Sequence, residues 1–199
     1  MPFPGPPDVE ERPGRPNDLE FRVSSSSSFP SAFSPAGSDL ITERLVLRPW
    51  SPAEVTAVLD DVRPAHWAAD FPAEGDRVIA GFIAGRPEAL GPYGQRQIIE
   101  RDSGLVVGAI GLFWPPHEGA LEFGYGVVPS RRGRGYAPEA ARAVVEFALA
   151  SAEVHTVHAD VEFMNPASIR VLEKAGLRRW NSDATTARFR ATAQEPTRS

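Results

Sequence analysis

The sequence predicts an α/β protein of the α+β kind, with a mixed sheet of about six to seven strands and about four helices on its faces. Two observations support this prediction. Segments with apolar residues at every second position, typical of half-buried strands, are interleaved with segments whose apolar residues recur every three or four positions, typical of amphipathic helices. Capping and turn residues separate most of these segments. The expected order is strand, two helices, three strands, helix, strand, helix and strand.

The first elements are a strand and two helices. Residues 44–48 alternate polar and apolar side chains and end at Pro49, as expected for a half-buried strand. The sequence Ser51-Pro52-Ala53-Glu54 is a capping box with proline at the first helical position, so it predicts a short helix. A second helix is expected over residues 76–84.

A hairpin and two strand–helix pairs follow. The turn Asp102-Ser103-Gly104 joins two apolar segments, which indicates a hairpin. Asn165-Pro166 combines an N-capping side chain with a proline at the first helical position, and Gly176 marks the end of that helix. The expected elements are strands at 97–101, 105–113 and 121–128, a helix at 138–150, a strand at 156–163, a helix from 166 to 176 and a closing strand at 187–192.

Residues 1–38 differ in composition from the rest of the chain. They are rich in proline and contain an unbroken run of serine at 24–28. Such a segment has little periodic apolar surface to offset the entropy lost on ordering. We therefore expect a disordered Pro/Ser-rich extension at 1–38, followed by a single folded domain at 39–199.

Composition excludes several classes of function. The chain has no cysteine, which rules out a disulfide scaffold, a thiol nucleophile and a thiolate metal site. Its net charge of -5 disfavours general binding to nucleic acid or to an anionic membrane. His155 and His158 are expected on opposite faces of a strand, so we expect no metal site. Without a membrane-length apolar stretch or a signal-peptide pattern, a cytoplasmic location is expected.

The segment from Val127 to Glu139 is the most informative about function. A strand leads into a loop with two glycines and three arginines, and a helix begins immediately after it. Free backbone N–H groups at a helix N-terminus bind phosphate, and glycine lets the backbone approach closely. A basic turn that only caps the helix is the simpler alternative. Because strand and helix flank the loop on the correct sides, an anion-binding loop is favoured.

Two common phosphate-binding motifs are absent from this loop. A P-loop needs lysine and then serine or threonine after its last glycine, and Gly135 is followed by Tyr136 and Ala137. A dinucleotide fingerprint needs a third glycine where Pro138 stands. Nucleotide hydrolysis and hydride transfer are therefore disfavoured.

The loop Arg132-Gly133-Arg134-Gly135-Tyr136-Ala137 resembles the R/Q-x-x-G-x-G/A signature of the GCN5-related N-acetyltransferases (GNATs), which grips the pyrophosphate of acetyl-coenzyme A. The segments 42–48, 122–125 and 165–177 are similar to the branch that includes the ribosomal-protein alanine N-acetyltransferases, so the resemblance covers residues 40 to about 180. It implies a GNAT-like, mostly antiparallel sheet whose splayed central strands bind the cofactor.

The resemblance also implies roles for individual residues. Val127 and Val128 occupy the position where exposed backbone pairs with the pantetheine arm. Asn165, an N-cap in its own right, is expected to contact the cofactor from the start of the last helix. The full expected cofactor-binding set is Val127, Val128, Arg132, Gly133, Arg134, Gly135, Tyr136, Ala137, Asn165 and Ser168.

Glu122 is the expected catalytic residue. An amine attacks a thioester only when it is unprotonated, so a nearby carboxylate can remove its proton directly or through water. Glu122 shares a strand face with Gly124 and Gly126, where missing side chains leave room for a substrate. An exposed strand charge paired with an arginine is the alternative.

One position departs from the family pattern. Many members have a tyrosine seven residues after the asparagine, suited to protonating the leaving thiolate, and Leu172 stands there. The general acid is therefore unassigned, with Ser168 and Tyr136 as candidates.

The expected activity is direct transfer of an acetyl group from acetyl-CoA to a primary amine, either of a protein N-terminus or of a small molecule. No metal and no covalent enzyme intermediate are expected. The alternative is a non-catalytic module that binds coenzyme A or acyl-CoA. Self-association into a homodimer is left open.

Overall fold

The structure is a computed structural model that describes residues 39–193. The extension expected at 1–38 lies outside the described residues. The strands are β1 (Leu40–Ile41), β2 (Leu45–Pro49), β3 (Gln95–Glu100), β4 (Val106–Leu112), β5 (Ala120–Val127), β6 (Thr156–Glu162), β7 (Arg178–Ser182) and β8 (Thr186–Thr192). The helices are α1 (Pro52–Leu59), α2 (Glu74–Ala84), α3 (Tyr136–Leu149) and α4 (Pro166–Lys174), with 3₁₀ turns η1 (Pro87–Leu90) and η2 (Pro129–Arg131).

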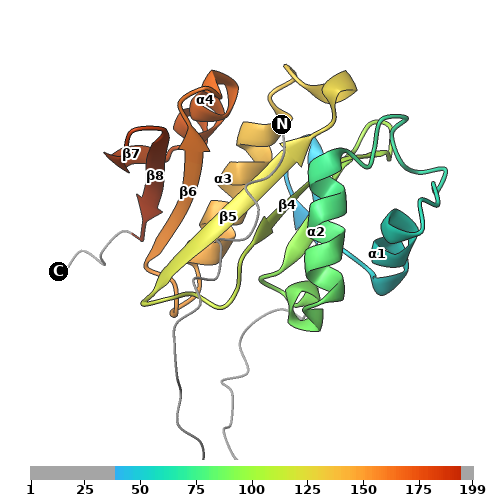
Figure 1. Ribbon diagram of the computed structural model, residues 1–199, viewed down its shortest axis with the longest axis horizontal. Helices are drawn as coiled ribbons and strands as arrows, with labels where there is room; N and C mark the ends of the chain where they lie inside the picture. Colours follow the sequence, from blue (N-terminus) through green and yellow to red (C-terminus); the bar gives the residue numbers. More distant parts are fainter. Residues whose placement is uncertain (1–38, 194–199) are drawn as a thin grey trace, which may run out of the picture.

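All eight strands belong to one sheet in the order β1-β2-β3-β4-β5-β6-β8-β7. Neighbouring strands run antiparallel except β5 and β6, which are parallel. The helix α3 lies behind the middle of the sheet with α4 beside it, and α2 lies in front with α1 next to it (Figure 1). The predicted α/β class, the mostly antiparallel sheet and the helices on its faces are confirmed.

The sheet has more strands than the sequence pattern indicated. The first addition, β1, contains only two residues, too few to show a period. The second, β7, has every side chain exposed, so its sequence lacks the alternation of a half-buried strand. It forms a hairpin with β8, the closing strand that was expected.

Local capping explains where the helices begin. The Oγ of Ser51 accepts a hydrogen bond from the Glu54 N–H at 3.3 Å, and the Glu54 carboxylate accepts from the Ser51 N–H at 3.0 Å. The predicted capping box of α1 is therefore confirmed. The helix α2 begins at Glu74, two residues before the predicted start, because the carboxylate of Asp76 accepts from the Ala73 N–H at 2.8 Å.

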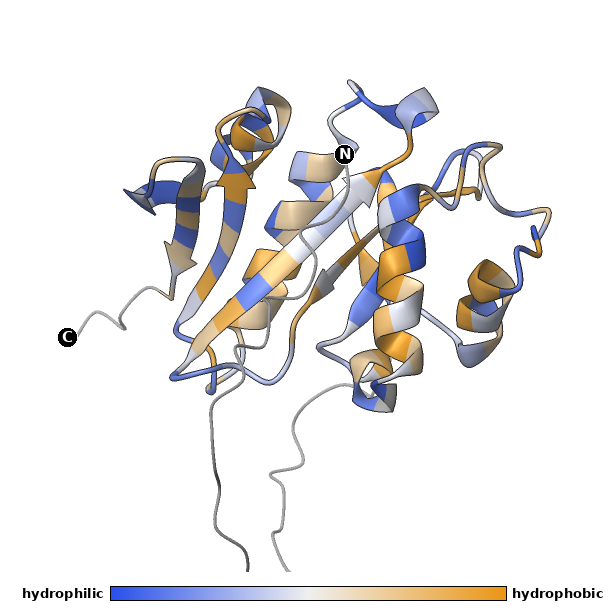
Figure 2. Ribbon diagram, viewed as in Figure 1, coloured by the Kyte–Doolittle hydropathy of each residue, from blue (hydrophilic) through white to orange (hydrophobic). Residues whose placement is uncertain are grey.

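The core fills both sides of the sheet. On one side, small and branched side chains of α3 pack against Leu45, Leu47, Ile98 and Ile110, all of which are buried. On the other, Phe71 packs against two indole rings. Figure 2 shows the apolar inner faces of these elements and the hydrophilic loop that follows β5. No helix within residues 39–193 combines the length and the apolar character needed to cross a membrane.

Candidate anion-binding cleft

The strands β5 and β6 separate in the middle of the sheet. Their parallel pairing joins residues 120–122 to residues 156–158 only. Beyond that point β5 pairs with β4 alone, and β6 pairs with β8 along its whole length. The two strands therefore diverge toward their C-terminal ends, as Figure 1 shows. The splayed central strands expected from the sequence are present.

The separation leaves backbone groups of β5 directed at the gap. The Phe113 N–H donates to the Glu122 carbonyl, and the Val128 N–H donates to the Val107 carbonyl, each at 2.9 Å. Hydrogen bonds of an antiparallel strand alternate between its two sides. Tyr125 and Val127 consequently turn their N–H and C=O groups away from β4 and toward β6.

The loop between β5 and α3 follows the expected geometry. Gly133 and Gly135 have φ of +77° and +82°, a backbone conformation that side chains with a Cβ rarely adopt. No side chain within residues 39–193 caps the N-terminus of α3. The first backbone N–H groups of this helix, on Tyr136 and Ala137, are thus available to an anion.

Loop, strand and last helix enclose a cleft of about 340 Å³. Of the expected cofactor-binding residues, those that line it are Val127, Arg132, Gly133, Gly135, Tyr136, Ala137, Asn165 and Ser168. Its other lining side chains include Tyr125, Arg131, Arg170 and Lys174. Four cationic side chains and no carboxylate therefore border this cleft in an acidic protein, which suits it to a polyanion.

Three expected residues lie outside the cleft lining. Val128 is 1% exposed, and its N–H is bonded to Val107. Arg134 turns away, with Nη1 3.3 Å from Oε1 of Glu100. Glu122 is partly buried on the strand face it shares with Gly124 and Gly126, opposite the face that contacts α3.

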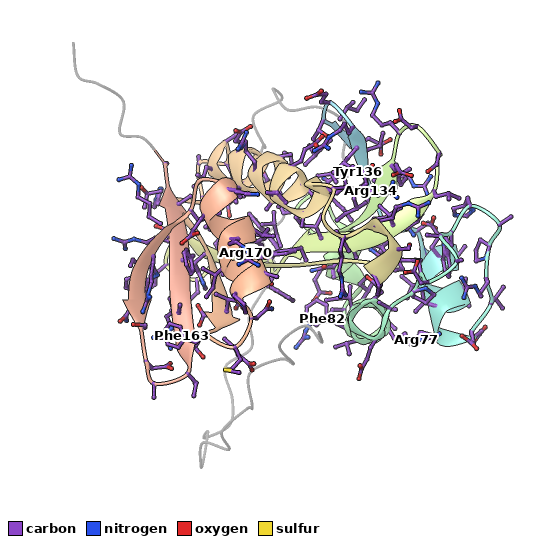
Figure 3. All side chains as sticks on the ribbon, turned by 90° about the horizontal axis from the view of Figure 1, so that it is seen from above. Arg77, Phe82, Arg134, Tyr136, Phe163 and Arg170 are labelled. Atoms are coloured by element: carbon purple, nitrogen blue, oxygen red, sulfur yellow. The ribbon has the colours of Figure 1, made fainter. Side chains whose placement is uncertain are left out.

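Glu100, at the end of β3, holds the loop from behind. Its Oε1 accepts a hydrogen bond from the Tyr136 hydroxyl at 2.6 Å, and its Oε2 accepts one from Ser103 at 2.6 Å. Arg131 and Arg134 approach the same carboxylate at 3.4 and 3.3 Å. Hydrogen bonds from Ser103 and Tyr136 lower the pKa of Glu100. The carboxylate therefore fixes two arginines and one tyrosine of the loop in position. Figure 3 shows Arg134 beside Tyr136 at the start of α3.

Two further contacts tie the loop to distant segments. Arg44 donates from Nη1 to the Arg134 carbonyl at 2.8 Å, and its Nη2 lies 2.6 Å from the Glu139 carboxylate. Asp70 accepts hydrogen bonds from the N–H and the hydroxyl of Ser130, at 2.9 and 2.7 Å. The loop is thus bound on both flanks before any ligand arrives.

The candidates for a proton donor differ in their surroundings. The Tyr136 hydroxyl is committed to Glu100. The Ser168 hydroxyl accepts a hydrogen bond from Nδ2 of Asn165 at 2.9 Å, within the cleft. Tyr125 also lines the cleft, and its hydroxyl lies 3.4 Å from the Ser168 carbonyl. Burial raises the pKa of Tyr125, so its proton is retained at neutral pH. Leu172 is 1% exposed and belongs to the core.

Glu122 has the environment of a proton acceptor. Burial raises the pKa of its carboxyl, the charge of His158 lowers it, and the charge of Asp160 raises it. A carboxylate with a raised pKa is a stronger base than an exposed one. On the same strand face, Phe113 contacts Phe82 of α2 with ring centroids 5.6 Å apart. This places Glu122 on the α2 side of the sheet, across β5 from the side chains that face α3.

Sequence reasoning missed several residues at this cleft. Arg170 and Lys174 are one turn apart on α4, a spacing that could have been read from the predicted helix. Tyr125 belongs to segment 122–125, which resembles the family, but alternation alone could not show that the first turn of α4 would contact its side chain. Glu100 had no sequence signal, because 31 to 36 positions separate it from its loop partners.

The comparisons with known proteins agree with this geometry. A sequence model described as an acetyltransferase (GNAT) domain matches residues 44–178. The uncharacterized N-acetyltransferase YnaD of Bacillus subtilis (strain 168) is 33% identical over 82 residues, which are 41% of this chain and 48% of that protein. The chain spans about half the length of the curated relatives it matches.

Solved structures share the fold. A GNAT-family acetyltransferase from Bacillus anthracis has a TM-score of 0.59 at 20% identity, covering 79% of this chain and all of that one. RimL, a ribosomal L7/L12 alpha-N-protein acetyltransferase solved in complex with coenzyme A, has a TM-score of 0.56 at 13% identity, covering 78% of this chain and 98% of that one. At these identities the likeness concerns the fold alone.

Proposed function

Because the chain belongs to the GNAT acetyltransferase family, we propose that it transfers an acetyl group from acetyl-CoA directly to a primary amine. The observation that carries the proposal is the cleft enclosed by the end of β5, the glycine loop and α4, next to the place where β5 separates from β6. One end of it has the glycine loop with free N–H groups, and one wall has backbone of β5 that no neighbouring strand pairs with. A long ligand with a pyrophosphate at one end and amide groups along its arm fits both features.

The residues fit acetyl-CoA on chemical grounds. Backbone N–H groups of Tyr136 and Ala137 would hold the pyrophosphate, and the side chain of Arg132 lines the same cleft. The backbone of Tyr125 and the N–H of Val127 would pair with the amides of the pantetheine arm, as an added strand does, while the Val127 carbonyl accepts from Arg132. Acetyl-CoA would supply an acyl group activated as a thioester.

Glu122 is proposed as the base that takes the proton from the amine. Gly124 and Gly126 leave the strand bare on that face, so an amine can approach from the α2 side. The new C–N bond forms at the acyl carbon as the C–S bond breaks, and the amine proton passes to Glu122 directly or through water. Its raised pKa makes the carboxylate a more effective acceptor of that proton.

Tyr125 is proposed as the donor that protonates the departing thiolate. Its hydroxyl lies in the cleft next to the first turn of α4, and its raised pKa keeps the proton available. In this proposal the proton donor is a tyrosine on β5, whereas in the family pattern it is a tyrosine on the last helix, at the position of Leu172. The Tyr136 hydroxyl donates to the Glu100 carboxylate at 2.6 Å, a charge-assisted hydrogen bond that is shorter than the 3.4 Å one from Tyr125 to the Ser168 carbonyl, so Tyr136 is less suited to this role.

The acceptor is proposed to be the amine of a protein N-terminus or of a small molecule. The name of RimL specifies a protein N-terminus as the acceptor of that relative in fold. In this chain the face that Glu122 shares with the two glycines is bordered by Phe82 and Phe113. Aromatic side chains beside a partly buried carboxylate favour an acceptor with an apolar portion next to its amine.

A turnover assay tests the proposal. Thiol release from acetyl-CoA is measured with peptides carrying different N-terminal residues, with polyamines and with amino acids as acceptors. Acceptor-dependent release with matching acetylated product is expected. Stabilisation by coenzyme A without release for any acceptor would instead indicate the non-catalytic binding module. Binding of neither acetyl-CoA nor coenzyme A would contradict both.

A further inference from the structure

Two cations on α4 face the cleft from the side opposite the glycine loop. Arg170 and Lys174 are four residues apart, so they lie on one helix face about one turn from each other. Both side chains are exposed, and both line the cleft. Figure 3 shows Arg170 on α4, with Tyr136 and Arg134 across from it at the start of α3.

The cations of the loop already have partners, in contrast to the two on α4. Arg131 lies 3.4 Å from Glu100, and Nε of Arg132 donates to the Val127 carbonyl at 2.9 Å. Within residues 39–193, no carboxylate forms an ion pair with Arg170 or Lys174. Among the described residues, the cleft therefore has two positive charges on α4 without an ion-pair partner.

The end of α4 that carries these charges is held in place. Nη2 of Arg142, on α3, donates to the Lys174 carbonyl at 2.8 Å. Buried Leu172 and Ala175 anchor the opposite face of this segment in the core. The side chains can move, but their attachment points are fixed relative to the loop, as a recognition site requires.

A neighbouring cavity suits an anion less well. It has a volume of about 630 Å³, lies on the other side of Gly135 and Pro138, and shares Lys174 with the cleft. Three glutamates line it, Glu43, Glu139 and Glu146, together with the cations Arg44, Arg142 and Lys174. Its formal charges cancel, whereas the cleft is lined by cations without a carboxylate, so the cleft is the better place for a phosphate.

We propose that Arg170 and Lys174 form a subsite for the 3′-phosphate of coenzyme A, distinct from the loop that holds its pyrophosphate. The inference rests on the proposed function, since it presumes that a coenzyme A thioester occupies the cleft. A phosphomonoester carries up to two negative charges and can accept hydrogen bonds from a guanidinium and an ammonium at once. The subsite selects coenzyme A over its 3′-dephospho form.

The test compares two ligands that differ only in this group. Calorimetry at fixed ionic strength measures Kd for coenzyme A and for 3′-dephospho-CoA. Wild-type protein should bind coenzyme A on the order of tenfold more tightly, as expected for two solvent-exposed ionic contacts. In the variant Arg170→Gln/Lys174→Gln, the affinity for coenzyme A should fall until the two ligands bind within about twofold of each other. Its affinity for 3′-dephospho-CoA should change little.

A charge-matched variant controls for the general field. Arg86 lies over the Phe82 ring at the end of α2, and Arg178 is exposed at the start of β7, both outside the cleft lining. The variant Arg86→Gln/Arg178→Gln loses the same two charges and should keep the wild-type preference. Melting temperatures of both variants verify that they are folded.

Each other outcome has a definite meaning. Equal binding of the two ligands by wild type overturns the subsite and leaves the proposed function standing. A preference that survives in Arg170→Gln/Lys174→Gln, or disappears equally in the charge-matched variant, also overturns it. Binding of neither ligand by wild type removes the proposed function together with the subsite.

Discussion

The Tyr136 hydroxyl donates a hydrogen bond of 2.6 Å to Oε1 of Glu100, and so joins the first residue of α3 to the last residue of β3. The carboxylate side chain is only 7% exposed, yet Arg131 and Arg134 also reach it. A single buried charge thus sets the position of the loop that faces the cleft. Because the loop is already ordered, less conformational entropy is lost when a ligand binds.

Glu100→Gln should destabilise the protein by about 1–3 kcal/mol, because two arginines lose a charged partner. The pKa of Glu100 is lowered in the folded state, so its stabilising contribution is full above the ordinary value of 4.5 and is lost as pH falls below it. The melting temperatures of wild type and variant should therefore converge in acid. Exposed Glu153→Gln is the control. A constant difference at all pH values would contradict this account.

Gly135→Val should abolish stabilisation by coenzyme A while the protein remains folded. A Cβ at this position would lie 3.2 Å from Nη2 of Arg44, and the valine would have to adopt the φ of +82° that Gly135 has. Gly104→Val is the matched control, since Gly104 has φ of +70° in the β3–β4 turn and open space for its Cβ. Both variants incur backbone strain of roughly 1–2 kcal/mol. In thermal shift assays only Gly135→Val should lose the response to coenzyme A, and an intact response would remove this loop from the site.

Tyr125→Phe should lower turnover by at least about tenfold, as loss of a general acid does. The aromatic ring is kept, so the Kd of coenzyme A should change by less than about twofold. Tyr136→Phe is the matched control: it breaks the hydrogen bond to Glu100 and should lower the melting temperature and cofactor affinity, with turnover at saturating acetyl-CoA largely retained. Wild-type turnover in Tyr125→Phe would assign the proton to another donor.

Asp76→Asn should change how stability depends on pH. Burial raises the pKa of Asp76 to about 7, and its Oδ1 has no hydrogen-bond partner within residues 39–193. Because the pKa of Asp76 is higher in the folded than in the unfolded state, its protonation stabilises the fold. This contribution to the free energy of unfolding is complete below the unfolded pKa of 3.8 and is lost as pH rises through about 7. The variant can keep the bond to the Ala73 N–H without burying a charge. Above pH 7 it should be more stable than wild type by on the order of 2 kcal/mol.

In thermal denaturation experiments, the stability difference between Asp76→Asn and wild type should shrink as pH falls below 7. Asp76→Ala controls for the cap, because it loses the hydrogen bond to Ala73 and should be destabilised in acid, where the wild-type carboxyl is neutral. A wild-type protein that is more stable than Asp76→Asn at pH 8 would show that the buried carboxylate has a favourable partner.

Local signals in the sequence predicted most of the framework. Ser51 and Asn165 mark helix starts because a cap requires a side-chain acceptor directly before the helix. The glycines of the phosphate loop identify it because only they adopt positive φ without strain. The divergence of β5 from β6 was expected only through the family resemblance, since neither strand encodes where pairing with the other stops.

Long-range contacts could not be predicted in this way. Arg44 and Glu139 are 95 positions apart, and Asp70 and Ser130 are 60 apart, so no periodicity connects them. The same applies to Tyr125, whose role depends on where the first turn of α4 comes to rest against β5. Site residues within the single loop between β5 and α3 could thus be predicted from the sequence. Those that reach the cleft from separate strands and helices could be identified only in the folded structure.

Glu122→Gln tests the step on which the proposed chemistry depends. The substitution keeps size and removes the ability to accept a proton, so turnover near neutral pH should fall by at least about tenfold while coenzyme A binding persists. Because the pKa of Glu122 is raised by burial, wild-type activity should decline toward acid at a pH above the ordinary value of 4.5. The difference in turnover between wild type and Glu122→Gln should become smaller at high pH, where the acceptor amine is already neutral.

Asp160→Asn provides the matched control for that experiment. Asp160 is exposed on β6, and its charge contributes to the raised pKa of Glu122. Its removal should leave maximal turnover near the wild-type value and move the acidic limb of the pH–rate profile to lower pH, since a carboxylate with less repulsion nearby loses its proton more readily. Wild-type turnover of Glu122→Gln at every pH would mean that the base is water or another side chain. An unmoved limb in Asp160→Asn would mean that the limb reports a group other than Glu122.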